Sequence, residues 1–174
     1  MHKINGYFET KEETRILKKQ VFLSLTILWV IFIYLNSFMN AYISSMQSGF
    51  VLGLIQGAAG IIRIPPDLIT EHMVRKSSHF FEYALLGFLM VVTAKLWYNK
   101  LKPHISFLLF LGLLIPVSDE FLQIFIVGRT GAVQDVVLDF AGFVSGAALC
   151  ILCSSIAAKY KKKRKDTAEK EPSS

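Results

Sequence analysis

The sequence is short of charge. Asp, Glu, Lys and Arg make up 18% of its 174 residues, whereas hydrophobic residues make up 53%. A soluble domain of this length is usually less apolar, and the 14 Phe residues fall in long apolar blocks, as is typical of a membrane protein. The scarcity of charge therefore argues against an ordinary soluble domain.

Cysteine is also scarce. The sequence has two, Cys150 and Cys153, which form a C-x-x-C inside an apolar block. A redox pair of this spacing normally belongs to a βαβ unit, which the sequence does not predict. We interpret both as small packing residues.

Several catalytic motifs are missing. The sequence contains no P-loop, no nucleophile elbow and no H-E-x-x-H, and no internal repeat is apparent. An enzymatic hypothesis must therefore rest on how separate polar residues gather in the fold.

Four long apolar blocks are present, at roughly 20–38, 77–98, 105–127 and 136–158. Each has about the 20 residues that a helix needs to cross a bilayer, and a helix satisfies its own backbone polar groups there. We therefore expect an all-α integral membrane protein with a four-helix transmembrane bundle over 20–158. Residues 1–19 then form an N-terminal segment and 159–174 a basic tail. No convincing cleavage site follows the first block, which favours a retained anchor.

Lys and Arg are unevenly placed, which sets the orientation by the positive-inside rule. Fifteen of the 19 lie in the N-terminal segment, around the link between the second and third blocks, or in the tail. The other loops hold Arg63, Arg75, Lys76 and Arg129. We therefore expect both termini to be cytoplasmic. The basic tail either binds anionic lipid or anchors the topology ahead of a disordered end, which is the simpler interpretation. No accompanying fold suggests nucleic acid as a partner.

The longest loop, roughly 39–75, then lies outside. Its stretch 48–62 is apolar but rich in glycine and too short to span, which predicts an interfacial or re-entrant helix. Pro65 and Pro66 end that stretch, because proline removes a backbone donor and restricts the residue before it.

Ionisable residues gather at the expected outer ends of three helices. On the second helix, Lys76 precedes His79, Glu82 and Tyr83, and the last three share one stripe. On the third helix, Pro116 favours a kink, and three polar residues follow it: Asp119, Glu120 and Gln123.

The fourth helix adds two more acids. Arg129 lies in the loop before it, between Gly128 and Gly131. Asp135 and Asp139 share a stripe with the G-x-x-x-G of 142–146, a motif that lets a neighbouring helix approach closely.

This clustering has a functional and an architectural interpretation. Charges near the membrane core are rare and usually face the bundle interior, where they are paired or functional. Several carboxylates with few bases cannot all stay ionised, so some are protonated, paired with Arg129, Arg75 or Lys76, or shared around a divalent cation. A network that only fixes helix register would use similar residues.

Four runs together resemble the VanZ-like family, which is named for a bacterial membrane protein associated with low-level teicoplanin resistance. They are KSSHFFEYALLG at 76–87, SDEFLQ at 118–123, the Gly128–Arg129 pair, and DVVLDFAG at 135–142. The resemblance extends over roughly 20–158 and includes IYLNS at 33–37. Two positions depart from the family pattern: the family often has His at the position of Leu122 and Pro at the position of Val127. The resemblance implies a plasma-membrane protein of the bacterial cell envelope that influences glycopeptide susceptibility.

Three functions compete. A binding protein would use Lys76, Tyr83, Gln123, Arg129, Asp135 and Asp139 to hold a lipid headgroup, a lipid-linked cell-wall precursor or the glycopeptide. An intramembrane enzyme acting on a lipid-linked precursor or polyprenyl phosphate would use His79, Glu82, Asp119 and Glu120 as bases, acids or cation ligands. An ion or proton-coupled transporter ranks last, since four helices are few unless the protein forms an oligomer.

Overall fold

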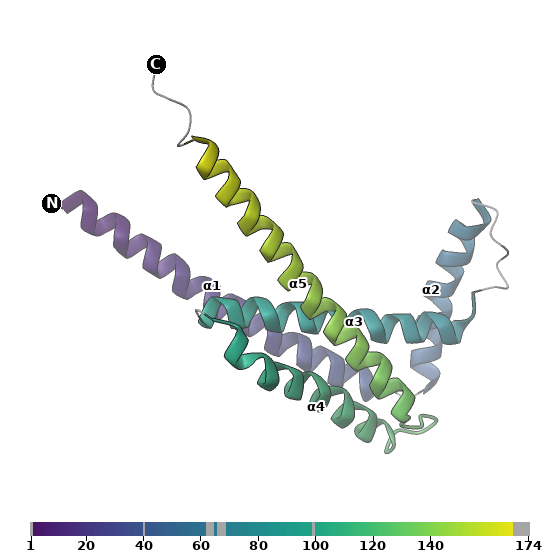
Figure 1. The fold of residues 1–174 in the computed structure, drawn as a ribbon. Helices are drawn as coiled ribbons and strands as arrows, with labels where there is room; N and C mark the ends of the chain where they lie inside the picture. The colour runs from purple at the N-terminus through teal and green to yellow at the C-terminus, as the bar shows by residue number, and fades with distance from the viewer. Residues whose placement is uncertain (1, 40, 62–64, 66–68, 99, 169–174) are drawn as a thin grey trace.

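A computed structural model describes residues 2–39, 41–61, 65, 69–98 and 100–168. These residues form five α-helices and no strand, which confirms the all-α prediction (Figure 1). The helices are α1 (His2–Ser37), α2 (Ala41–Ile61), α3 (Glu71–Trp97), α4 (Ile105–Gln123) and α5 (Val133–Ala168), with a short 3-10 turn, η2 (Lys102–His104), before α4.

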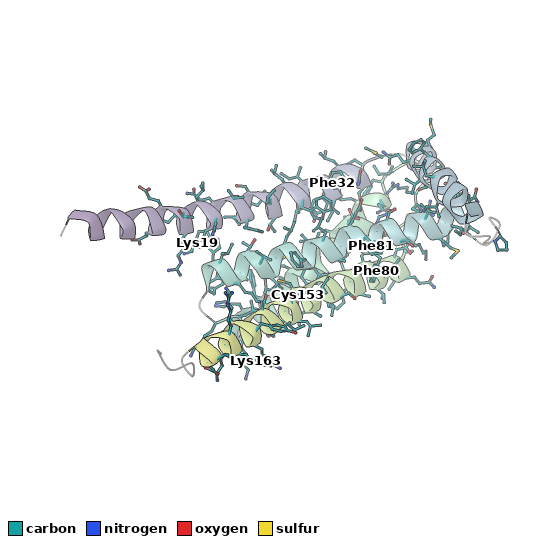
Figure 2. All side chains as sticks on the ribbon, turned by 90° about the horizontal axis from the view of Figure 1, so that it is seen from above. Lys19, Phe32, Phe80, Phe81, Cys153 and Lys163 are labelled. Carbon is teal, nitrogen blue, oxygen red and sulfur yellow. The ribbon has the colours of Figure 1, made fainter. Side chains whose placement is uncertain are left out.

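Four helices are long and apolar enough to cross a membrane. The candidate spans are Glu12–Ser37, Glu71–Trp97, Lys102–Gln123 and Val133–Arg164. They coincide with the four apolar blocks, because a run of about 20 apolar residues has few other stable conformations in lipid. Many large apolar side chains on them are exposed, including Phe32 and Phe81 (Figure 2). Such an apolar exterior suits a lipid environment.

The four spanning helices form a ring. Figure 2 shows α3 between α1 and α5, and α4 closes the ring through contacts with both α5 and α1. The core between them consists of Ile33, Tyr83, Leu86, Met90 and Phe143.

The closest helix pair is α3 and α5. A Cβ atom on Gly142 would overlap with the carbonyl oxygen of Phe80, and one on Gly146 with that of Ala84. The two backbones therefore touch along this stripe, as the G-x-x-x-G predicted.

Some helix ends differ from the predicted bounds. The predicted disordered end does not begin directly after the basic residues, because α5 continues through them to Ala168. Likewise α1 begins at His2, well before the apolar block. Lys, Arg, Glu and Ala favour helix outside the membrane as well as inside it. In contrast, α4 ends at Gln123, four residues before the predicted end of its block.

The segment predicted as an interfacial or re-entrant helix is helical over its described part, 48–61. It belongs to α2, which begins at Ala41 and is not among the candidate spans. In Figure 1, α2 stands at an angle to the bundle. Pro65 follows α2, and Pro66 lies outside the described residues.

The bundle has two chemically different ends. The N-terminal end of α1 and the C-terminal end of α5 lie at one end, which we call the lysine end (Figure 1). There the Lys19 Nζ lies 5.3 Å from the centroid of the Trp97 ring, and Lys95 Nζ donates a hydrogen bond of 3.4 Å to the Cys150 carbonyl. Cys150 is buried and Cys153 exposed, both as free thiols. The opposite end, where α2 and loop 124–132 lie, is the polar end.

Candidate functional site

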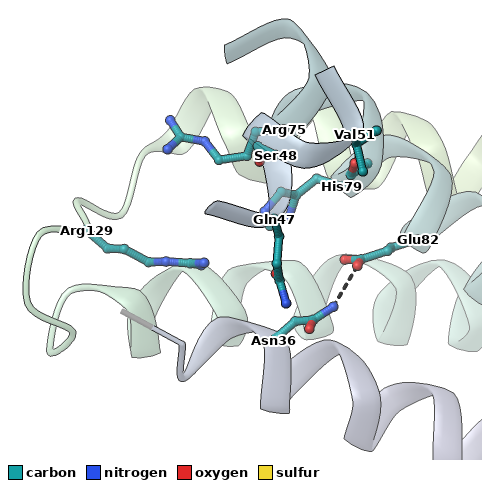
Figure 3. A pocket seen from close by; sticks show the side chains of 9 residues that line it. Asn36, Gln47, Ser48, Val51, Arg75, His79, Glu82 and Arg129 are labelled. Atoms are coloured by element: carbon teal, nitrogen blue, oxygen red, sulfur yellow. Dashed lines mark hydrogen bonds between the residues drawn. The ribbon is translucent and has the colours of Figure 1, made fainter. Parts of the chain in front are cut away.

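The polar end holds two adjoining cavities. The first, which we call the amide pocket, is lined by Asn36, Gln47, Ser48, Val51, Arg75, Ser78, His79, Glu82 and Arg129 (Figure 3). The second, the acidic pocket, is lined by residues that include His72, Arg75, Lys76, His79, Glu120, Gln123, Arg129, Asp135 and Asp139. Arg75, His79 and Arg129 border both cavities. The acidic pocket has a volume of ≈ 310 Å³, which is at the lower end of the range for small-ligand sites.

Helix α1 contributes to the amide pocket through Asn36. Its Nδ2 donates a hydrogen bond of 2.8 Å to Glu82 Oε1 (Figure 3). Trp29 Nε1 donates one of 2.9 Å to the Glu82 carbonyl. The α1–α3 contact thus fixes Glu82 through both its side chain and its backbone. Gln47 and Ser48 bring α2 to the same cavity.

Asp119 lies in a fully buried network between α1 and α4. Ser37 Oγ donates a hydrogen bond to Asp119 Oδ1, and Gln123 Nε2 donates one of 3.3 Å to Asp119 Oδ2. Gln123 Nε2 also reaches Ser37 Oγ at 3.4 Å. Asp119 and Gln123 lie one helical turn apart on α4, and both oxygens of the Asp119 carboxylate have a donor.

The first turns of α5 face α3 through an ion pair, Lys76–Asp135, and a longer contact between His79 and Asp139. Lys76 Nζ lies 3.0 Å from Asp135 Oδ1, and His79 Nδ1 lies 3.8 Å from Asp139 Oδ2. Asp139 is fully buried, whereas Asp135 is about one-third exposed. The G-x-x-x-G stripe below brings these side chains together by holding the two backbones in contact.

Glu120 joins the end of α4 to the start of α5. Its Oε2 accepts a hydrogen bond of 2.9 Å from the Ala132 backbone N–H, directly before α5 begins. A carboxylate suits this place because the first N–H groups of a helix lack partners and carry partial positive charge. The loop returns to α4 through Gly128, whose φ of 80° favours glycine. At Gly131 a Cβ would overlap with the Glu120 carbonyl.

Arg129 and Arg75 line the cavities without a carboxylate partner, and Arg75 Nη2 lies 3.5 Å from His72 Nδ1. Among the described residues, neither guanidinium has an Asp or Glu oxygen within 4.0 Å. Arg129 is half-buried, and this burial lowers the pKa of its guanidinium below the usual value. Arginine nonetheless stays charged in proteins. Two permanent positive charges therefore border both cavities.

The structure thus brings together most of the predicted site residues. Among them, Lys76, His79, Glu82, Glu120, Gln123, Arg129, Asp135 and Asp139 line the cavities, and Asp119 lies behind them in the buried network. Tyr83 does not line the cavities: its ring packs in the apolar core, and its hydroxyl lies beside the carboxylate of Asp119.

Sequence reasoning missed the α1 contribution. Asn36 and Ser37 are neutral, so a search for charged residues gives them no site role, although both belong to the run IYLNS of the family resemblance. Gln47 and Ser48 of α2 were missed for the same reason.

A helical bundle with four candidate spans and a buried polar cluster at one end defines a multi-pass membrane protein of the all-α class. A family profile described as VanZ/LLP1 matches residues 22–154, so the chain belongs to the VanZ/LLP1 family. Comparisons with curated proteins and with solved structures give no match.

Proposed function

We propose that the polar end binds the anionic group of an envelope component, such as the phosphate of a lipid-linked cell-wall precursor. The protein acts in the bacterial plasma membrane, with the polar end outward and both termini cytoplasmic. Occupancy of the site changes how much precursor is available, and through it the susceptibility of the cell to teicoplanin or a related glycopeptide. Membrane lipids surround the bundle, and their headgroups compete for the same site.

The observation that carries the proposal is the pair of arginines without carboxylate partners. A buried or half-buried charge is normally paired, yet Arg75 and Arg129 border a cavity instead. A guanidinium forms strong, often bidentate, hydrogen bonds with phosphate and carboxylate. Asn36, Gln47 and Ser78 supply neutral donors and acceptors for the sugar or amide groups beside such an anion.

The outward orientation follows from charge. The lysine end carries the basic tail and the bases near Trp97, and such clusters stay in the cytoplasm. The polar end then faces the side of the membrane on which glycopeptides act.

The test compares polyprenyl phosphate with polyprenol binding to the full chain in lipid nanodiscs. We expect the wild type to prefer the phosphate. Arg129→Gln should weaken that binding at least about tenfold, since a hydrogen bond to a charged group contributes about 1.5–3 kcal/mol. Arg164→Gln, at the lysine end, is the matched control and should bind as the wild type does.

Susceptibility to teicoplanin provides the cellular measurement. At equal membrane abundance, Arg129→Gln should behave like a strain without the protein, and Arg164→Gln like the wild type. Equal binding of phosphate and alcohol by the wild type would contradict the proposal.

An intramembrane enzyme is the second candidate, and the His79–Asp139 pair favours it. A carboxylate beside an imidazole can orient a general base, and both residues border the acidic pocket. Purified protein should then release phosphate from polyprenyl phosphate, and His79→Asn should stop the release while binding remains. If the wild type binds polyprenyl phosphate but releases no phosphate, the enzymatic function is excluded and only the binding function remains.

Transport is less well supported. The described core beside the site is apolar, with Leu86, Met90 and Phe143 filling the middle of the ring. A proton or ion path along a single bundle would need polar groups there.

A further inference from the structure

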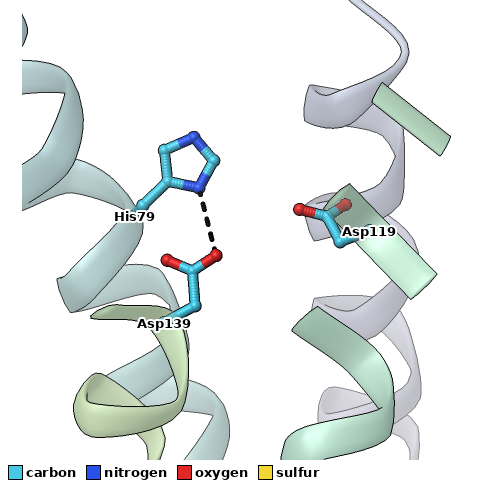
Figure 4. Close-up of side chains that lie close together, drawn as sticks. All are labelled: His79, Asp119 and Asp139. Atoms are coloured by element: carbon cyan, nitrogen blue, oxygen red, sulfur yellow. Dashed lines mark ion pairs between the residues drawn. The ribbon is translucent and has the colours of Figure 1, made fainter. Parts of the chain in front are cut away.

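We infer that His79, Asp119 and Asp139 form a binding site for a divalent cation. One ligand atom from each of these side chains lies within 4.8 Å of the other two. The three residues come from α3, α4 and α5, so the site joins three helices (Figure 4). Ligands about 2.1 Å from a metal are roughly 3–4 Å apart, so small side-chain rotations would bring these atoms to binding distance.

The buried carboxylate of Asp139 points to a missing partner. Neither of its oxygens has a hydrogen bond among the described residues, and neither has His79 Nδ1. The 3.8 Å between His79 Nδ1 and Asp139 Oδ2 exceeds hydrogen-bond distance. Figure 4 shows the imidazole and the Asp139 carboxylate turned toward each other.

The local charges favour a cation at this position. Asp119 and Asp139 are both 0% exposed, and a buried carboxylate is costly unless it is paired or binds a metal. Lys76 is already paired with Asp135. Within the described residues, no Lys or Arg nitrogen lies within 4.0 Å of Asp119 or Asp139.

The surroundings resemble the outer shell of a metal site. Ligating carboxylates are usually held by further hydrogen bonds, and Asp119 is held by Ser37 and Gln123. The position of His79 relative to Asp139 is fixed by the backbone contact of Gly142 with Phe80. The three ligands are thus pre-positioned by groups that take no part in coordination.

The ligand set indicates which cation binds. One imidazole with two carboxylates suits Zn²⁺ or Mn²⁺ better than Mg²⁺ or Ca²⁺, which prefer oxygen ligands alone. His79 and Asp139 also border the acidic pocket, so a remaining coordination position would face that cavity. If the proposed function holds, this position takes a phosphate oxygen of the bound headgroup.

The experiment measures metal bound to the full chain in detergent or nanodiscs. After chelator treatment and incubation with Zn²⁺ or Mn²⁺, we expect about one equivalent per chain. Asp139→Asn and Asp119→Asn should lose it, whereas Glu71→Gln, a carboxylate that lines neither cavity, should retain it. Ser37→Ala should weaken the affinity by about 10- to 100-fold, the usual effect of removing an outer-shell partner.

Two results would overturn the inference. One is a wild type that binds no metal above the level of a protein-free nanodisc. The other is full metal binding by both Asp139→Asn and Asp119→Asn. Should either variant fail to fold by size-exclusion chromatography, His79→Gln takes its place with the same expectation.

This test separates the two proposals. Arg129→Gln should lose polyprenyl phosphate but keep the metal, because its guanidinium is not a ligand. Phosphate binding without metal in the wild type would refute the cation site and leave the proposed function standing. Metal binding without phosphate binding would refute the proposed function and leave the cation site standing.

Discussion

At the scale of single residues, the acids of the polar end have different surroundings. Glu82 accepts a hydrogen bond from Asn36, Glu120 accepts one from a backbone N–H, and Asp135 pairs with Lys76. Asp139 has none of these partners. Residues of one chemical type therefore carry different tasks, and each is tested by a different substitution.

Glu120 is expected to contribute to stability. Glu120→Ala leaves the first turn of α5 without the acceptor for the Ala132 N–H, which should lower the free energy of unfolding by about 1–2 kcal/mol. Glu120→Gln should lower the free energy of unfolding by less, because the amide oxygen of Gln can still accept the hydrogen bond from the Ala132 N–H. Thermal unfolding in detergent measures both, with Glu12→Ala at an exposed position as control. An unchanged midpoint in Glu120→Ala would show that the hydrogen bond is not needed.

At the scale of helices, the α3–α5 contact determines the site. The carbonyl oxygens of Phe80 and Ala84 leave no room for a side chain at Gly142 or Gly146. A larger residue at either glycine must push α3 and α5 apart. His79 on α3 and Asp139 on α5 would then also move apart.

Gly146→Leu should therefore be strongly destabilising. Overpacking a core usually costs about 1–3 kcal/mol, and here the obstacle is backbone, which yields less easily than a side chain. Gly53→Leu on α2 is the matched control, since no atom lies within 4 Å of the position of its Cβ. The membrane abundance and the midpoint temperature of thermal unfolding should fall in Gly146→Leu but not in Gly53→Leu. Similar behaviour of the two variants would exclude a special role for the stripe.

The elements themselves were largely predictable. Apolar blocks identify the four spans because lipid restricts a long apolar run to a helix. The G-x-x-x-G identifies the face of the last span that a neighbouring helix approaches, but not which helix that is. Helix ends were less predictable. Hydropathy marks where the membrane stops, whereas α1 and α5 continue as exposed polar helices, and α4 stops where loop 124–132 turns back onto Glu120.

At the scale of the whole molecule, the two ends of the bundle differ in charge and in the presence of cavities. The lysine end carries exposed bases of α1 and α5, and the polar end carries the two cavities. This asymmetry is the basis of the proposed orientation, because cytoplasmic loops are enriched in Lys and Arg.

Labelling with a membrane-impermeant thiol reagent tests the orientation. In a background where Cys150 and Cys153 are replaced by Ser, Thr130→Cys should react in intact cells. Lys163→Cys should react only after lysis. Both introduced positions are exposed, so accessibility depends on the side of the membrane alone. The opposite pattern would invert the topology.

The site was predictable in its charged members and in Gln123. The orientation rule placed three groups of acids at one end, and helix geometry gave Asp135 and Asp139 a common face. Nothing in the sequence could show that Tyr83 turns into the core or that Ser37 reaches Asp119, because these depend on how α1 rotates against its neighbours.

The count of charges at the polar end has a consequence for the order of binding. Five carboxylates (Glu82, Asp119, Glu120, Asp135 and Asp139) meet three permanent cations (Arg75, Lys76 and Arg129). The carboxylates that remain ionised oppose an anion in the cavities, and a divalent ion bound at His79, Asp119 and Asp139 would offset their charge. Cation and phosphate would then strengthen each other's binding by the same factor, as thermodynamic reciprocity requires. The availability of the metal outside the cell would thereby control whether the protein engages its lipid at all.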